Sequence, residues 1–190
     1  RDLSGLTFQV VDTDGAPYGG KHFAFWNPVT LEKSTEKRRS TNMEAANIFA
    51  QLVANKVRTI TFVRSRKVAE LVNLYAQRQL ARVMPSLRER ISPYRASYVA
   101  EDRRRIEKAF LNGELLGVTS TNALELGIDV GELDATVMTG YPGSVASTWQ
   151  QAGRSGRRLE ESLAILVGQD NPLDQYFMHH PEAFFGRSME

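Results

Sequence analysis

The 190-residue chain contains no cysteine, which excludes disulfide bonds, cysteine nucleophiles and zinc sites built from thiolates. Its apolar residues, 42% of the total, come in short runs and never approach the ~18–20 consecutive residues of a membrane-spanning helix. Residues 1–3 show no methionine and no basic-then-apolar leader, so we expect a piece of a longer polypeptide. The length suffices for one hydrophobic core, and we expect one soluble domain without a membrane partner.

The charges nearly cancel, with 24 Lys and Arg against 22 Asp and Glu and a net charge of +2, but they are unevenly distributed. Residues 56–108 hold fourteen basic and five acidic residues, whereas the remainder holds ten basic and seventeen acidic ones. Eighteen of the basic residues are arginines, which favour planar, bidentate contacts with phosphate. The pattern is equally compatible with solvated helix faces, and composition alone leaves both interpretations open.

Residues 1–40 predict a lead-in segment with short strands, because apolar runs alternate with turn-forming residues there. From residue 41 to 190, strand-like and helix-like segments alternate with short loops. This order favours an α/β domain with a doubly wound parallel sheet and helices on both faces. Predicted strands cover 6–11, 22–26, 57–63, 94–98, 115–120, 135–139 and 162–167, with breaks at 84–85 and 92–93. Predicted helices cover 41–56, 66–82, 101–112, 122–126, 145–152 and 172–178.

Ligands of such sheets bind at the carboxyl ends of the strands, so the loops after Val63, Ser120 and Thr139 are the first candidates for a site. Another segment, Gly15–His22, nearly matches a phosphate-binding loop. It lacks the magnesium-binding hydroxyl after Lys21, and a strand-like run follows it where a helix is needed. We therefore predict an ordinary turn before a strand.

Two segments carry the strongest functional signal: Thr119-Ser-Thr-Asn-Ala-Leu-Glu-Leu-Gly-Ile-Asp129 and Gln150-Gln-Ala-Gly-Arg-Ser-Gly-Arg-Arg158. In the second, arginines three residues apart alternate with glycines. Arginine presents a guanidinium to phosphate, and glycine allows the backbone to come close to a partner surface.

These segments resemble motifs five and six of superfamily 2 helicases, the DEAD/DEAH-type nucleic-acid-dependent ATPases, in their second RecA-like domain. Thr59–Arg66 is similar to motif four, and Tyr94–Tyr98 with Glu101–Arg103 is similar to the accessory motif after it. The strings Ala-Leu-Glu-Leu-Gly-Ile-Asp, Gly140-Tyr-Pro-Gly-Ser and Trp149-Gln-Gln-Ala-Gly-Arg-Ser-Gly-Arg together most resemble the RecQ4-like bacterial DNA-repair helicases of the mitomycin repair factor A type. The resemblance implies a RecA-like fold and a bacterial cytoplasmic or nucleoid location.

In this family ATP lies between two RecA-like domains, and the first supplies the phosphate loop and most contacts to ATP and Mg²⁺. The second supplies arginine fingers, whose guanidinium groups stabilise charge on the transferred phosphoryl group. The resemblance assigns this catalytic role to Arg154 and Arg157. It assigns nucleotide contacts to Asp129, Gly127 and Gln150, although Asp129 is also compatible with a simple capping role.

The resemblance further implies contacts with the backbone of a DNA strand. Thr121 and Asn122 occupy the motif-five positions, where a hydroxyl, an amide and free backbone N–H groups suit a phosphate oxygen. Further candidates are Arg64, Ser65, Arg66, Arg95 and Arg103. Ser65 is also compatible with a helix cap, and the arginines with a solvated surface.

Two features receive no role: Glu125, to which we assign no chemistry, and His179-His180, which lack the further ligands of a metal site. The residues contain neither a true phosphate loop nor an Asp-Glu box, so we expect the chain alone not to hydrolyse ATP. The leading hypothesis is the motor half of an ATP-dependent DNA helicase, 3′ to 5′, acting in DNA repair on single strands or forks with a first RecA-like domain. Alternatives are a non-catalytic nucleic-acid-binding or partner-docking module, and a double-strand translocase or RNA helicase with the same motor.

Overall fold

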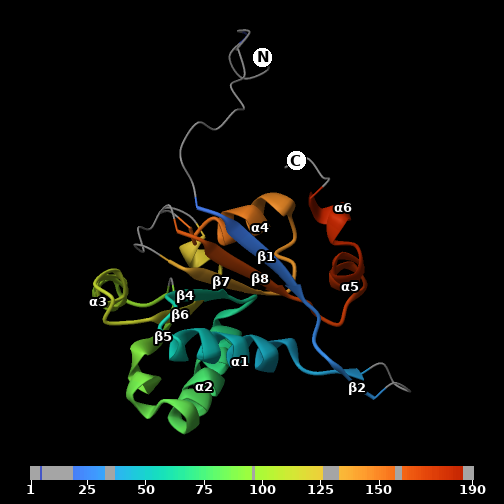
Figure 1. Ribbon diagram of the computed structural model, residues 1–190. Coiled ribbons are helices and arrows are strands. Elements are labelled where there is room, and N and C mark those ends of the chain that lie inside the picture. Colours follow the sequence, from blue (N-terminus) through green and yellow to red (C-terminus); the bar gives the residue numbers. More distant parts are fainter. Residues whose placement is uncertain are drawn as a thin grey trace.

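A six-stranded, fully parallel sheet forms the centre of the molecule (Figure 1). The computed structural model describes Gly5 and residues 19–32, 37–95, 97–125, 133–156 and 160–185. The strand order is β1-β8-β7-β4-β6-β5. The strands are β1 (Lys21–Trp26), β4 (Thr59–Phe62), β5 (Ile91–Tyr94), β6 (Gly117–Ser120), β7 (Ala135–Thr139) and β8 (Ser162–Val167).

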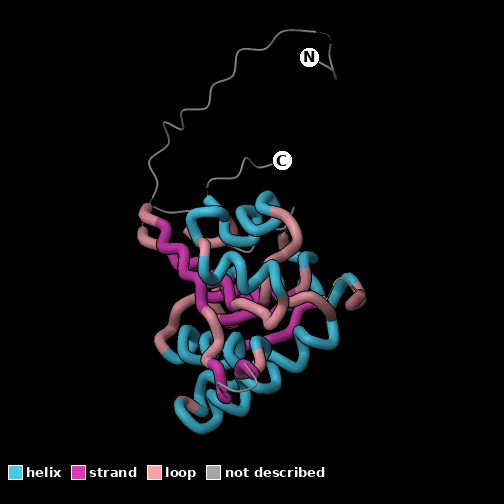
Figure 2. The backbone as a smooth tube through the Cα atoms, turned by 90° about the vertical axis from the view of Figure 1, so that its right-hand side faces the viewer, coloured by secondary structure: helices cyan, strands magenta, loops and turns pink. Residues whose placement is uncertain are grey.

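Helices cover both faces of this sheet, so that strands lie between helical layers in the side view (Figure 2). Helices α1 and α2 pack together on one face, and α3 and α4 pack on the other against Ile60 and Phe62. The predicted doubly wound α/β fold is therefore confirmed. The helical elements are α1 (Thr41–Ala54), α2 (Arg66–Val83), η1 (Pro85–Arg90), α3 (Ala100–Leu111), η2 (Asn122–Leu124), α4 (Val145–Ala152), α5 (Pro172–His179) and α6 (Pro181–Phe185).

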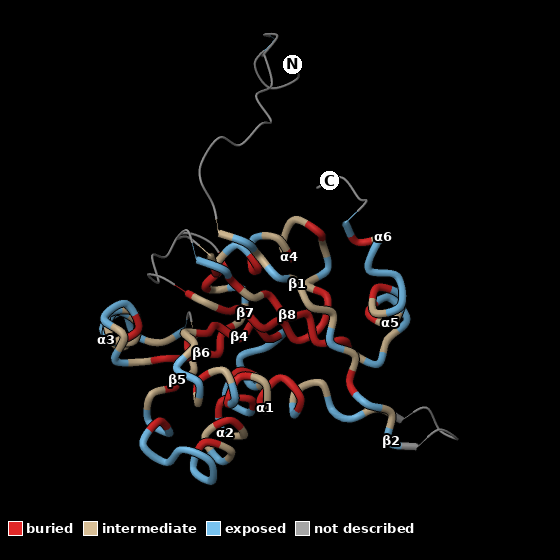
Figure 3. The backbone as a smooth tube through the Cα atoms, in the orientation of Figure 1, coloured by how far each residue is buried: buried red, intermediate tan, exposed pale blue. Residues whose placement is uncertain are grey.

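The central strands are buried along their whole length, as Figure 3 shows by their red colour. Every residue of β4, β6 and β7 is buried. Successive residues of a strand point to opposite faces of the sheet. Because helices cover both faces here, no residue of a central strand faces the solvent. Gly117 at the start of β6 illustrates the tight packing, because a Cβ atom there would lie 2.4 Å from the Phe49 ring of α1. The core thus holds the strand ends in fixed positions.

Most predicted elements are confirmed within a few residues, but the predicted strand at 94–98 is wrong. The strand is β5, Ile91–Tyr94, and it includes Ser92 and Pro93, where we expected a break. Because β5 pairs only with β6 at the edge of the sheet, the missing N–H of Pro93 is tolerated there. Four short elements were not predicted: β2 (Thr30–Glu32), β3 (Lys37–Arg38), η1 and α6.

The segment 1–40, predicted to lead into the domain, contributes a strand to its sheet. β1 pairs in parallel with β8, from Lys21 opposite Ser162 to Trp26 opposite Val167. Phe23 and Phe25 of β1 pack against Phe184 of α6, which fastens the C-terminal helices to this edge. The predicted strand at 6–11 and turn at 12–17 lie outside the described residues.

The chain changes direction across the sheet between β4 and β7. After β4 it runs through α2 to β5 and then β6, and after β7 it runs through α4 to β8 on the other side. Helices α2 and α4 cover opposite faces, so a crevice opens outside the carboxyl ends of β4 and β7. Ligands of doubly wound sheets bind at such a switch point.

Candidate functional site

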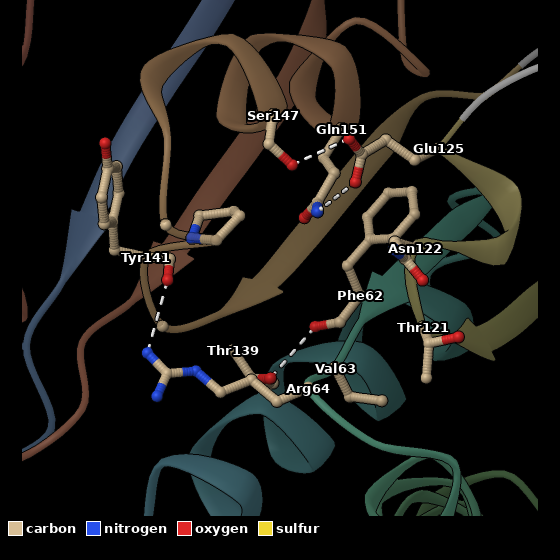
Figure 4. A pocket seen from close by; sticks show the side chains of 13 residues that line it. Phe62, Val63, Arg64, Thr121, Asn122, Glu125, Thr139, Tyr141, Ser147 and Gln151 are labelled. Atoms are coloured by element: carbon tan, nitrogen blue, oxygen red, sulfur yellow. Dashed lines mark hydrogen bonds between the residues drawn. The ribbon is translucent and has the colours of Figure 1, made fainter.

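A cavity of about 570 Å³ lies at this switch point, at the carboxyl ends of β4, β6 and β7 (Figure 4). The three loops that the sequence singled out all contribute to it. Predicted site residues Arg64, Thr121 and Asn122 line it together. Its remaining wall consists of Phe62, Val63, Glu125, Thr139, Gly140, Tyr141, Pro142, Gly143, Ser147 and Gln151.

Arg64 follows β4, and its position is fixed by a buried carboxylate. Its guanidinium donates to the Tyr141 carbonyl (3.3 Å) and lies 3.7 Å from a carboxylate oxygen of Asp174 in α5. Asp174 is 1% exposed and also accepts from the backbone N–H groups of Tyr141 (3.1 Å) and Gln169 (2.8 Å). One carboxylate thus orients both the arginine and the loop after β7. The guanidinium remains half-exposed at the cavity wall.

The N-terminus of α2 lies beside Arg64 and is strongly positive. Ser65 caps this helix by accepting from the Val68 N–H group (3.3 Å), which confirms the capping alternative. Arg66 and Lys67 are exposed in the first turn, which contains no acidic residue. Cations are unfavourable at a helix N-terminus, whereas an anion there is stabilised by the dipole and the free N–H groups. The arrangement is suited to a phosphate group.

Thr121 and Asn122 lie on the opposite wall, directly after β6. Thr121 is the residue before the short helix η2 and is half-buried, and Asn122 is exposed. Figure 4 shows both side chains directed away from the Glu125 carboxylate. Their hydroxyl and amide groups are therefore available at the cavity rim for polar contacts that do not depend on base identity.

Glu125, to which the sequence assigned no chemistry, joins the loop after β6 to α4. Its carboxylate accepts from the Ser147 hydroxyl (2.8 Å) and from the Gln151 amide (2.9 Å), as the dashed lines of Figure 4 show. Its backbone carbonyl accepts from the Arg154 guanidinium. Glu125 is 8% exposed, so these bonds are largely shielded from water. Ser147 and Gln151 are four residues apart and therefore share one face of α4. This spacing is the sequence feature that could have indicated a common partner for the two side chains.

The turn after α4 carries Arg154 and is held closely against β8. Gly156 adopts a φ of +82°, and its N–H group donates to the Leu133 carbonyl (3.0 Å). A Cβ atom at this position would lie 2.3 Å from the Ser162 hydroxyl. Gly156 is therefore required by a close approach inside the domain, whereas the sequence suggested an approach to a partner surface.

Of the predicted nucleotide-site residues in the described chain, Gln150 and Arg154 are not among the residues that line the cavity. Gln150 is exposed on α4, and its neighbour Gln151 is the residue that reaches Glu125. The predicted nucleotide contact of Gln150 stays a prediction. Gly127, Asp129 and Arg157 lie outside the described residues.

Arg95 and Arg103 lie outside the cavity, toward β5, the outermost strand on that side of the sheet. Arg95 pairs with Glu70 of α2, and its guanidinium lies 5.6 Å from the centre of the Tyr98 ring. Arg103 is half-buried in α3 beside Tyr94. Burial, followed by a hydrogen bond to Glu107, raises the pKa of Tyr94 to about 12, so the tyrosine is neutral at physiological pH. Strand contacts by Arg95 and Arg103 stay predictions.

His179 and His180 make local contacts. His179 Nδ1 lies 2.7 Å from the Gln175 carbonyl, and His180 Nδ1 lies 3.2 Å from the Glu182 carboxylate. Within the described part of the chain, no group of three His, Asp or Glu side chains is placed to hold a metal ion. Over the same residues, no helix combines the length and apolar character needed to cross a membrane.

Residues 44–158 match the family model of the helicase conserved C-terminal domain. The chain belongs to this family. It is 48% identical over 190 residues to YprA of Bacillus subtilis, an uncharacterized ATP-dependent helicase, covering 100% of this chain and 25% of that protein. It is 42% identical over 189 residues to the ATP-dependent helicase HRQ1 of Saccharomyces cerevisiae, covering 96% of this chain and 17% of that protein.

A crystal structure of the DUF1998 helicase MrfA bound to DNA and AMPPNP superimposes on this helicase C-terminal domain with a TM-score of 0.89 and 48% identity. The superposition covers 100% of this chain and 26% of that one. The predicted superfamily 2 membership and the RecA-like fold are thereby confirmed. The chain spans about a quarter or less of the length of these relatives.

Proposed function

We propose that this helicase C-terminal domain is the second RecA-like domain of an ATP-dependent DNA helicase. The observation that carries the proposal is the arrangement of Glu125, whose single side chain joins the loop of Thr121 and Asn122 to the helix that leads into Arg154. A motor domain needs such a link, because strand binding and ATP hydrolysis must influence each other. The relatives named ATP-dependent helicases, and MrfA bound to DNA and AMPPNP, support this interpretation.

On the nucleotide side, Arg154 and Arg157 act as the arginine fingers, and Gly127, Asp129 and Gln150 contact the rest of the nucleotide. Guanidinium groups in a water-poor cleft stabilise the negative charge that develops on the transferred phosphoryl group. Such a cleft forms only when a first RecA-like domain closes on this one. That domain supplies the phosphate loop and holds Mg²⁺.

On the strand side, the positive end of α2 and the cavity rim bind the phosphate backbone of single-stranded DNA. Arg64 supplies charge at one wall of the cavity, and Thr121 and Asn122 supply polar groups at the other. Ser65 and Arg66 add charge and N–H groups at the adjacent start of α2. Arg95 and Arg103 extend this strand path toward β5. Movement from 3′ to 5′, a role in DNA repair and a bacterial cytoplasmic location rest on the resemblance alone.

Replacing Arg66 with alanine in the longer polypeptide is expected to weaken single-stranded DNA binding about three- to tenfold at physiological salt. The slope of log affinity against log salt concentration becomes shallower by roughly 0.7 for each phosphate that is no longer neutralised. Fluorescence anisotropy at several salt concentrations measures both quantities. Arg82→Ala is the matched control, because Arg82 is exposed in the last turn of the same helix, about 24 Å away. Wild-type affinity and salt slope in the Arg66→Ala variant would contradict the proposed strand site.

A further inference from the structure

Lys21 belongs to the segment Gly15–His22 that nearly matches a phosphate-binding loop. In the structure its side chain instead contacts oxygen atoms of the domain itself. Lys21 begins β1, outside the residues that match the family model. Its ammonium group lies within hydrogen-bond distance of four oxygen atoms. These are the carbonyl oxygens of Ala152 and Ser155, both at 2.8 Å, and the hydroxyl oxygens of Ser155 and Ser162, both at 3.1 Å.

Three of these four acceptors belong to the turn that carries Arg154. Ala152 is the last residue of α4, and Ser155 lies three residues further on, immediately before Gly156. Carbonyl groups at a helix C-terminus lack helical partners, and a cation there is favoured by the helix dipole. Lys21 therefore holds both ends of the turn from which Arg154 projects.

The fourth acceptor and Gly156 complete a tight contact between this turn and the sheet. Ser162 is the first residue of β8 and lies opposite Lys21 in the sheet register. A Cβ atom on Gly156 would lie 3.4 Å from the Lys21 ammonium nitrogen and 2.3 Å from the Ser162 hydroxyl. The turn is thus pressed against the two residues that anchor it and has little room to shift.

Placing a cation in this partly buried position carries a desolvation cost. Burial lowers the pKa of Lys21 from its ordinary value of 10.5. All four acceptors named above are uncharged, so Lys21 stabilises carbonyl and hydroxyl groups rather than forming an ion pair with them. An apolar side chain would avoid the desolvation cost but would leave the two carbonyl groups without these donors.

We propose that Lys21 is a positioning residue for phosphoryl transfer, which fixes the turn that presents Arg154 to the nucleotide. This inference rests on the proposed function and adds a residue of β1 to its machinery. Arginine fingers act through geometry, and a displacement of about 1 Å can cost roughly 100-fold in rate. Loss of Lys21 consequently lowers the rate of hydrolysis rather than the affinity for ATP or for the strand.

The test compares Lys21→Met and Lys21→Arg in the longer polypeptide, with steady-state ATP hydrolysis at saturating single-stranded DNA. Lys21→Met is expected to lower kcat about 10- to 100-fold, with the KM for ATP and the strand affinity within roughly twofold of wild type. Lys21→Arg, which keeps charged donors, restores a substantial part of kcat. His22→Ala is the control, because His22 is the exposed neighbour of Lys21 in β1 and its ion-pair partner Glu161 lies outside the turn, so its kcat is expected to equal that of the wild type.

Two results overturn the inference while leaving the proposed function intact. In the first, single-stranded DNA stimulates ATP hydrolysis by the wild type, and the Lys21→Met variant has the same kcat as the wild type. The other is a Lys21→Met variant in which kcat, strand affinity and thermal midpoint fall together without rescue by arginine, since this marks a purely structural lysine. Should the methionine variant fail to fold, Lys21→Gln replaces it under the same criteria. A wild type without strand-stimulated hydrolysis would instead contradict the proposed function itself.

Discussion

Replacing Arg157 with alanine in the longer polypeptide is expected to lower strand-stimulated ATP hydrolysis by about 10³- to 10⁵-fold. The role of Arg157 comes from the family resemblance, and the structure adds the setting, in which the preceding turn is fixed by Lys21, Ser162 and the Leu133 carbonyl. Because the guanidinium acts on charge that develops during phosphoryl transfer, binding of single-stranded DNA is expected to stay within about twofold of wild type.

Initial-rate assays with saturating ATP and DNA, paired with strand-binding titrations, measure this effect. Arg78→Ala is a suitable control, since Arg78 is an exposed arginine of α2. It is expected to retain normal turnover and normal binding. An Arg157→Ala variant with normal turnover would refute the finger assignment, and equal losses of turnover and binding would point to misfolding instead.

Glu125→Ala is also expected to have a large effect, because it removes the side chain that joins the strand loop to α4. The Ser147 hydroxyl and the Gln151 amide would lose a largely buried acceptor, at a cost of about 2–4 kcal/mol in the free energy of unfolding. In the longer polypeptide, we expect DNA to stimulate ATP hydrolysis much less, by at least about tenfold, because a coupling of 1–3 kcal/mol between sites corresponds to roughly 5- to 150-fold.

Glu125→Gln is the matched variant for this prediction. Its amide keeps the shape of the carboxylate, can accept from Gln151 and can donate to the Ser147 hydroxyl. We expect it to retain most of the stability, measured by urea unfolding, and most of the stimulation ratio. A Glu125→Ala variant that is destabilised but stimulated by DNA to the wild-type extent would show that Glu125 contributes only to folding.

The fold could be predicted from the sequence where a local pattern decides the structure. The β-branched run of β4 and the apolar face of α2 behind its Ser65 cap are such cases. Pro93 misled the prediction of β5, because tolerance of proline depends on the strand lying at the edge of the sheet. That position is a property of the whole topology and has no local signature.

The candidate site could likewise be predicted only where the position of a residue follows from the order of the strands. Arg64, Thr121 and Asn122 meet because residues that follow parallel strands share one edge of the sheet. Asp174 and Lys21 could not be found this way. Asp174 contacts Arg64 and Tyr141, 110 and 33 positions away, and Lys21 contacts residues more than 130 positions away, so these contacts are set by tertiary packing.

The basic stretch 56–108 is only partly directed toward a candidate strand site. Arg58 donates to the Phe110 carbonyl, and its guanidinium lies 5.3 Å from the centre of the Phe110 ring. It precedes β4 and so lies at the amino end of that strand, opposite the cavity. Arg90 donates to the carbonyl groups of Gly113 and Glu114. These arginines satisfy backbone carbonyls and hold loops together. The excess of basic residues in 56–108 is therefore larger than the number of arginines available to phosphate. Arg64 and Arg66 carry the proposed contact.

We propose that this domain is one half of an ATP-hydrolysing site. The most direct test measures ATP turnover with single-stranded DNA for the 190-residue chain alone and for the longer polypeptide that includes the proposed first RecA-like domain. We expect no turnover by the chain alone and strand-stimulated turnover by the longer polypeptide. Turnover by the isolated chain, or a longer polypeptide whose turnover DNA does not stimulate, would contradict it.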